Sequence, residues 1–89
     1  MRVEPRAAQV RQLVFDVLRS LGEATSSLFE LEETVMIHEG RCLGRKYRTP
    51  RLTAVWLLDA GLVRFYDRRG KVLRTINLFE ELAPLRMAA

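Results

Sequence analysis

The chain has 89 residues, of which 48% are hydrophobic and 29% are charged, so we expect a single domain over residues 1–89 with one core rather than a disordered chain. It has no apolar run of the roughly 18 residues that a membrane span requires, and its N-terminus leads into no apolar signal segment. Cys42 is the only cysteine, which excludes an internal disulfide. These features are typical of a cytoplasmic protein with no membrane partner.

The net charge of +4 is distributed unevenly along the chain. Residues 1–40 carry a charge of −3, whereas residues 41–76 carry +8, with ten basic residues against only Asp59 and Asp67. Thirteen of the fifteen basic residues in the chain are arginine. Such an excess is typical of a surface for an anionic partner. The alternative is a compositional bias toward arginine on a solvated face, and the sequence does not separate the two.

The first predicted element is an amphipathic helix over about residues 5–21, with Pro5 in its first turn and Gly22 as the left-handed residue that ends it. Ser27 followed by Glu30 is the pattern of a capping box and predicts a short second helix from Leu28 to about Glu33. The apolar stripe of the first helix recurs at helical spacing and consists of Val10, Leu13, Val14, Val17, Leu18 and Leu21.

Turn signals predict an antiparallel meander over residues 34–76. Glu39-Gly40 suits a two-residue hairpin turn, and residues 59–61 and 68–70 are three-residue loops that each end in glycine. The predicted fold is therefore α+β, with the N-terminal helix packed on a small antiparallel meander. The turns predict these pairs: Ile37 with Cys42, Met36 with Leu43, Leu57 with Val63, Trp56 with Arg64, Tyr66 with Val72, Phe65 with Leu73 and Arg64 with Arg74.

These registers divide the strands into two faces, because side chains directly opposite each other share a face. The first face is nearly all apolar and is expected to pack on the helix, while the second is mixed. The first collects Val55, Leu57, Val63, Phe65, Leu73 and Thr75. The second collects Ala54, Trp56, Leu58, Leu62, Arg64, Tyr66, Val72, Arg74 and Ile76.

The string from Val55 to Val63 resembles the end of the recognition helix and the first wing strand of winged-helix transcription regulators. That resemblance implies a different fold, in which residues 52–58 form a helix begun by Thr49 and Pro50. Residues 40–48 are too long and too β-prone for the tight turn that such a fold requires, so we favour the meander. In the winged helix, Arg48, Arg51 and Thr53 would enter the major groove, and Arg68, Arg69 and Lys71 would lie in a wing on the DNA backbone.

A second resemblance covers about half of the chain, since four short segments recur in the same order as in a set of short uncharacterised bacterial proteins. The resemblance implies no activity. The segments are Glu33-Thr34-Val35-Met36-Ile37, Gly44-Arg45-Lys46-Tyr47, Ala54-Val55-Trp56-Leu57 and Phe65-Tyr66-Asp67.

A short C-terminal helix is predicted after the meander. Asn77 is a suitable N-cap with Glu80 three residues later, and Pro84 stops the helix. Residues 85–89 are expected to form a loose tail.

The sequence offers no set of residues for catalysis, for a cofactor or for a metal. His38 and Cys42, the only histidine and the only cysteine, fall on opposite faces of the predicted hairpin, so they cannot form a nucleophilic pair. The segment from Gly40 to Lys46 is one residue too short between its glycines for a phosphate loop, and Tyr47 stands where a metal-binding hydroxyl is needed. We therefore expect a protein that is not an enzyme.

The mixed face of the meander is the predicted interaction surface. An apolar patch exposed on a small domain indicates a partner, and aromatic residues and arginine are enriched in protein interfaces. We therefore expect a protein partner or a second copy of the chain. The alternative partner is nucleic acid, because arginine interleaved with aromatic residues also binds unpaired bases and phosphates. The predicted residues are Trp56, Arg64, Tyr66 and Arg74, joined by Arg41 and Arg45.

Overall fold

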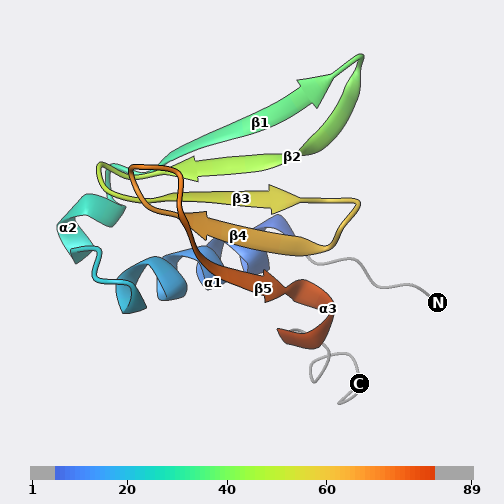
Figure 1. Cartoon of the computed structure of the whole chain (residues 1–89). Helices are drawn as coiled ribbons and strands as arrows, with labels where there is room; N and C mark the ends of the chain where they lie inside the picture. Colours follow the sequence, from blue (N-terminus) through green and yellow to red (C-terminus); the bar gives the residue numbers. More distant parts are fainter. Residues whose placement is uncertain (1–5, 82–89) are drawn as a thin grey trace.

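A computed structural model describes residues 6–81 of the chain. It confirms an α+β fold, with an N-terminal helix, a five-stranded antiparallel sheet and a short C-terminal helix (Figure 1). None of the helices within this range has the length and hydrophobicity of a membrane span. The elements are α1 (Ala7–Ser20), α2 (Thr25–Leu28), β1 (Glu32–His38), β2 (Arg41–Arg48), β3 (Thr53–Leu57), β4 (Leu62–Tyr66), β5 (Val72–Asn77) and α3 (Leu78–Glu81).

Helix α1 ends as its sequence predicts. The backbone N–H of Glu23 donates to the carbonyl of Leu18 at 3.0 Å, and Gly22 adopts the left-handed conformation, with φ of 103°. This arrangement satisfies carbonyl groups that the last turn leaves free. The predicted start at Pro5 lies outside the described residues. The apolar stripe is buried at Val10, Val14, Val17 and Leu18.

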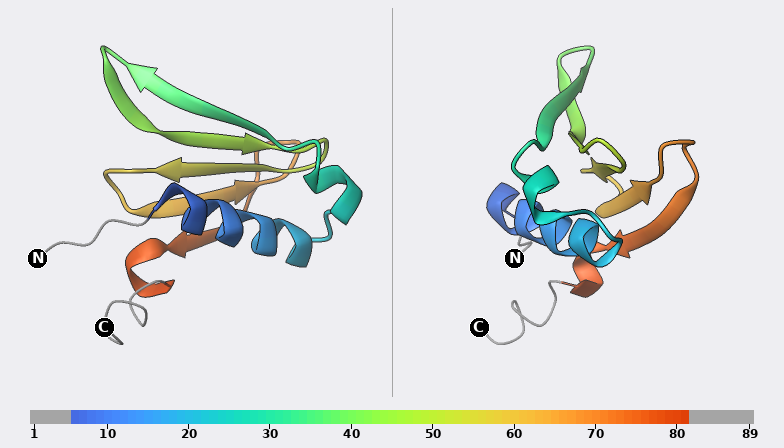
Figure 2. Two further views of the ribbon diagram at one scale, coloured as in Figure 1. Left: turned by 180° about the vertical axis from the view of Figure 1, so that it is seen from behind. Right: turned by 90° about the vertical axis from the view of Figure 1, so that its left-hand side faces the viewer.

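The second helix lies earlier in the chain than predicted. It covers Thr25–Leu28, and Glu32 and Glu33 already belong to β1. The expected helix from Leu28 to Glu33 is therefore wrong, because the alternating residues that follow Leu31 extend the strand backward at the expense of the helix. This short helix brings the chain from the end of α1 to the edge of the sheet (Figure 2).

The five strands form a simple meander in the order β1-β2-β3-β4-β5, with every neighbouring pair antiparallel. Residues 53–57 are a strand, so the winged-helix alternative, with its helix over residues 52–58, is wrong. The sheet curves around α1, which covers one of its faces (Figure 2). We call this the inner face. The opposite face, which no helix within residues 6–81 covers, we call the outer face.

Strands β3 and β4 pair one residue away from the predicted register. Trp56 lies opposite Val63, not Arg64. The loop contains residues 58–61, one more than predicted, and is closed by a hydrogen bond from the Gly61 N–H to the Leu57 carbonyl at 2.9 Å. Because successive side chains alternate between faces, the extra residue moves the whole of β3 to the opposite face relative to β4.

The other two hairpins agree with the prediction at their turns and depart from it further along. Ile37 pairs with Cys42 and Tyr66 with Val72, as predicted. An extra residue, Leu43 in β2 and Leu73 in β5, then shifts the remaining pairs by one. The pairs beyond these bulges are therefore Met36 with Gly44, Phe65 with Arg74, Arg64 with Thr75 and Val63 with Ile76.

The core lies between α1 and the inner face. Along one cross-strand row, Ala54 sits between Tyr47 and Phe65, and all three side chains are fully buried. A small residue between two large ones fills the layer without crowding, which the predicted register, with Val55 in this row, would not achieve. The buried residues are Val10, Val14, Val17, Leu18, Leu28, Tyr47, Leu52, Ala54, Trp56, Val63, Phe65, Ile76 and Leu78.

Helix α3 begins at the predicted cap. The Asn77 side-chain oxygen accepts hydrogen bonds from the N–H groups of Phe79 and Glu80, at 2.9 and 3.2 Å. The predicted stop at Pro84 and the tail of residues 85–89 lie outside the described residues.

We predict that Gly44→Ala destabilises the fold by about 2–4 kcal/mol, since it adds both strain and overlap. Gly44 has φ of 156°, and a Cβ there would lie 1.8 Å from the Trp56 carbonyl oxygen. Gly40→Ala is the control, because Gly40 also has positive φ, 77°, but no atom lies within 4 Å of its added Cβ. Urea denaturation measures both variants, and equal losses in the two would contradict the role of the overlap.

Candidate functional site

The predicted interaction surface does not exist as one face. Trp56 lies opposite Arg45 and Val63, so these three side chains share the inner face. The Trp56 side chain is only 6% exposed and belongs to the core. Its predicted grouping with Arg64 and Tyr66 is therefore wrong, because the extra residue in the β3–β4 loop turns β3 over.

Two more of the predicted arginines make contacts within the fold. Arg74 lies opposite Phe65 on the inner face, and its Nη1 donates to the Ser20 hydroxyl at the end of α1, at 3.2 Å. Arg41, beside the β1–β2 turn, forms an ion pair with Asp59 at 3.6 Å. Of the six predicted residues, Arg64 and Tyr66 remain together on the outer face, opposite Val55 and Thr53.

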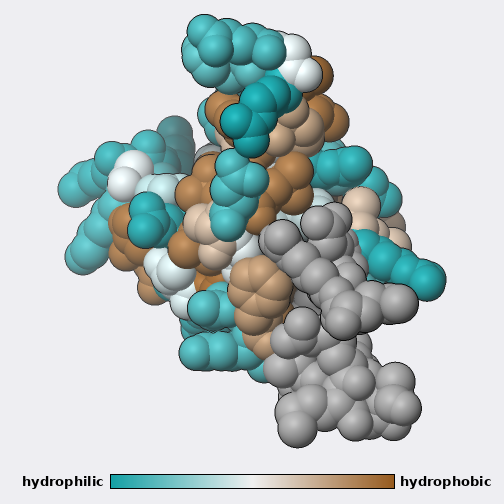
Figure 3. All heavy atoms as spheres, turned by 90° about the vertical axis from the view of Figure 1, so that its right-hand side faces the viewer, coloured by the Kyte–Doolittle hydropathy of each residue, from teal (hydrophilic) through white to brown (hydrophobic). Residues whose placement is uncertain are grey.

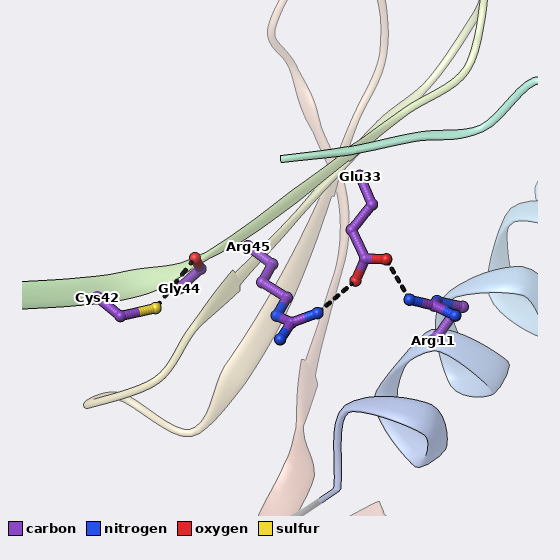
Figure 4. Close-up of polar contacts among 5 residues, drawn as sticks. All are labelled: Arg11, Glu33, Cys42, Gly44 and Arg45. Carbon is purple, nitrogen blue, oxygen red and sulfur yellow. Dashed lines mark hydrogen bonds and ion pairs between the residues drawn. The ribbon is translucent and has the colours of Figure 1, made fainter. Parts of the chain in front are cut away.

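Arg45 belongs to a charged cluster at the rim of the core (Figure 4). Its Nη1 donates to one carboxylate oxygen of Glu33 at 3.0 Å, and Arg11 of α1 donates to the other oxygen. Partial burial raises the pKa of Glu33, but the hydrogen bonds from Arg45 and Arg11 outweigh it and hold this pKa below its ordinary value. The cluster ties β1 and β2 to the helix, so Arg45 has a structural role.

The Tyr47 hydroxyl is buried beside this cluster. Within the described residues it forms no hydrogen bond of normal geometry. Burial raises the pKa of Tyr47 to about 12, and the negative charge of Glu33 acts in the same direction. The phenol therefore stays neutral at physiological pH and serves as a core group.

The strongest candidate site is a basic depression lined by residues of β2, the β2–β3 loop, the start of β3 and the β4–β5 loop. Figure 2 shows these two loops at the same end of the sheet. The volume of the depression is about 350 Å³, and four cationic side chains, Lys46, Arg48, Arg51 and Arg68, line it. The first two project from β2, and Arg51 and Arg68 come from the two loops. Thr49, Pro50, Leu52 and Thr53 complete the lining.

A buried hydrogen-bond network fixes the loop that forms the floor of the depression. The Thr49 N–H donates to the Leu52 carbonyl at 2.9 Å, and the Leu52 N–H donates to the Thr49 hydroxyl at 3.1 Å. That hydroxyl lies 3.0 Å from a carboxylate oxygen of Glu23, to which it can donate its proton. Thr49 and Glu23 are each only 4% exposed. The end of α1 thus holds the loop, and with it Arg51, in place.

The four cations of the basic depression have no anionic partner in the described part of the chain. No ion pair joins any of them to a carboxylate of residues 6–81. Glu32 is the cross-strand neighbour of Arg48 but is not within ion-pair distance of it. Asp67 is engaged by its own turn, where hydrogen bonds from the backbone N–H groups of Lys71 and Arg69 lower the pKa of its carboxyl. The buried carboxylate of Glu23 lies 3.0 Å from the Thr49 hydroxyl, but within residues 6–81 no ion pair neutralises any of the four cations.

The sequence contained one signal for this depression, the excess of +8 over residues 41–76. Eight of the ten cations in that segment, all except Arg41 and Arg45, form no ion pair with a described carboxylate. The sequence assigns Arg48, Arg51 and Arg68 to an anionic partner only in the winged-helix alternative. Grouping these three with Lys46 required the loops to be placed side by side, which no local pattern predicts.

Other chemistry receives no support from the arrangement of the described residues. His38 and Cys42 belong to neighbouring cross-strand pairs and so to opposite faces of the hairpin, as predicted. Within residues 6–81, no group of three or more His, Cys, Asp or Glu side chains is positioned to hold a metal ion. Gly44, in the segment compared above with a phosphate loop, instead serves the close approach of β2 to Trp56.

Comparisons of the chain with models of protein families, with curated proteins and with solved structures found no match.

We predict that Glu33→Gln lowers the free energy of unfolding by about 1 kcal/mol at pH 7, because it removes one charge of the cluster. The pKa of Glu33 is lower in the folded chain than the unfolded value of about 4.3. The stabilisation is therefore complete above that value and is lost as the pH falls through the folded pKa. Urea denaturation at pH 7 and at about pH 2.5 measures the difference between wild type and variant, which should shrink in acid. A difference that stays constant with pH would contradict the ion pairing.

Proposed function

We propose that this protein binds single-stranded nucleic acid through its outer face, with the basic depression holding the phosphates. The observation that carries the proposal is the set of four unpaired cations, Lys46, Arg48, Arg51 and Arg68, around one open depression. Three of the four are arginine, whose planar donors match phosphate oxygens. The location expected from the sequence, the cytoplasm, is part of the same proposal.

The neighbouring surface supports a strand of nucleic acid rather than a single small anion. Tyr66 and Arg64 lie on the same outer face, and Tyr66 shares a cross-strand row with Thr53 and Arg48. The Tyr66 side chain is half-buried and Arg64 is exposed. A flat sheet surface with an aromatic ring beside arginines is a common way to stack an unpaired base while its phosphates are held.

The fold favours single strands over duplex DNA. Sequence-specific binding of duplex DNA commonly places a helix in the major groove. In the described residues, the only long helix is α1, and its apolar stripe is buried against the inner face. One strand and two loops supply the cations, so their contacts follow a backbone laid across the sheet.

We predict that a single-stranded oligonucleotide binds at low salt and is released steeply as salt rises, because each phosphate contact releases counterions. The double variant Arg51→Ala/Arg68→Ala removes two contacts and should reduce the slope of log affinity against log salt by about 1.4, at roughly 0.7 per contact. Fluorescence anisotropy with a labelled oligonucleotide measures the slope.

The matched control for this experiment is Arg6→Ala/Arg19→Ala, which removes the same charge from exposed positions at and on α1. The control should leave the salt slope nearly unchanged. The proposal fails if the wild-type chain does not bind at low salt, or if both double variants weaken binding equally.

We predict that Tyr66→Leu weakens binding by about 1–3 kcal/mol without changing the salt slope, since stacking of a base on the ring is not ionic. Leucine keeps an apolar side chain on the sheet and preserves the fold. The same anisotropy titration measures this effect, with Val72→Thr, at the cross-strand neighbour of Tyr66, as the control. Unchanged affinity for Tyr66→Leu would exclude the ring from the site.

A further inference from the structure

Strand β1 is an edge strand of the sheet. It pairs with β2 along one edge and with no strand of residues 6–81 along the other. All seven of its residues run without an insertion, because the bulge next to it lies at Leu43 in β2. The other edge strand, β5, is itself interrupted by the bulge at Leu73. Bulges are one of the features that prevent edge strands from pairing. Strand β1 is therefore the better template for an additional strand.

Strand β1 also carries exposed apolar side chains on the inner face. Val35 and Ile37 belong to the inner face, yet they are 45% and 67% exposed. Ile37 lies in the part of the hairpin that extends beyond β3, whereas the row of Val35 continues through Arg45 to Trp56. In Figure 3, hydrophobic surface gathers beneath the hydrophilic tip of this hairpin. These side chains require a cover that the described part of the chain does not supply.

A groove of about 570 Å³ lies beside the first half of the same strand. Phe15 of α1 together with Leu28, Phe29 and Leu31 forms its apolar wall, and Glu33 of β1 is at its rim. Phe29 is 88% exposed. Strand β1 therefore has an exposed apolar side chain, Ile37, two residues after Val35. Two residues before Val35 it has Glu33, which lines the apolar groove.

We propose that β1 pairs antiparallel with β1 of a second copy of this chain, across a two-fold axis at Val35. The axis stands perpendicular to the sheet, so the two sheets become one and both α1 helices lie on the same side. Ile37 of each copy then comes opposite Glu33 of the other, beside its groove. The exposed end of one strand meets the groove of the other, and the same contact occurs twice, as in an isologous interface.

Val35 is the central residue of Glu32–His38, so this register pairs all seven residues of the strand, and charge and the alternation of faces support it. Pairing about Val35 puts Glu32 opposite His38 of the second copy on the outer face. Pairing about Met36 would instead put Glu33 opposite Glu39, and like charges directly opposite are destabilising. Registers centred between two residues would bring inner and outer side chains together and are excluded. The occupant is a second copy because Ile37 and Glu33, which lines the groove, lie on the same strand two residues to either side of Val35, so a two-fold axis there brings each beside the other.

This inference does not depend on the proposed function, but the two are compatible. The two-fold axis keeps both outer faces on one side of the joined sheet. Both basic depressions then belong to one surface.

Sedimentation at increasing protein concentration tests the pairing. The wild-type chain should shift from monomer to dimer, and Val35→Lys should remain monomeric, because a lysine at the axis meets its own copy. Val72→Lys is the matched control: it changes a valine of the other edge strand that is 47% exposed, and it should still dimerise. Circular dichroism confirms that each variant is folded. A wild-type chain that stays monomeric at every concentration, or equal dissociation by the two variants, would overturn the proposal.

Cross-linking tests the register. Val35→Cys in a Cys42→Ser chain should form a disulfide-linked dimer on mild oxidation, because residues opposite each other in an antiparallel pair lie within disulfide distance. Val72→Cys in the same chain should not. A linked dimer from Val72→Cys, or none from Val35→Cys, would overturn this register.

Discussion

The apolar stripe of α1 must be buried from water, and only one face of the sheet can pack against it. Because strand side chains alternate, the choice of inner face assigns every residue of the sheet either to the core or to the surface. The large side chains of the inner face are those of Tyr47, Trp56 and Phe65. The small side chain of Ala54 leaves room for Tyr47 and Phe65 on either side of it. The close approach at Gly44 is part of the same packing, since a side chain there would collide with the backbone of Trp56.

This constraint also separates the charges. Charged groups on the inner face or at its rim are neutralised or hydrogen-bonded within the fold: Glu33 by Arg45 and Arg11, and Arg74 through Ser20. An unpaired charge beside the core would be costly, so the contacts of the largely buried Glu33 carboxylate contribute to stability. Charges on the outer face and in its loops are free of this requirement. The cations of the basic depression are accordingly free for an external anion.

The two ends of the sheet differ in character. At one end β2 and the β2–β3 and β4–β5 loops line the basic depression, and the buried contact between Thr49 and Glu23 holds the first of these loops (Figures 1 and 2). At the other end the β1–β2 hairpin extends beyond β3 and exposes Ile37. The first end suits an anionic ligand and the second suits another strand.

The sequence by itself determined the elements whose causes are local. Each of these elements depends on a few neighbouring residues, and the structure confirms them within the residues it describes. They are the helix over about residues 5–21, the glycine at its end, the cap at Asn77 and the turns at Glu39-Gly40 and residues 68–70.

Only the tertiary structure decided which face each strand presents. One extra residue in the β3–β4 loop placed Trp56 in the core and separated it from Arg64 and Tyr66, and the bulge in β5 moved Arg74 to the inner face. The two predicted hairpin registers agreed with each other, but agreement between neighbours does not establish the face, because a one-residue insertion changes the turn slightly and moves every side chain beyond it to the opposite side. Packing against α1 selects between such alternatives, and it acts between segments far apart in the sequence.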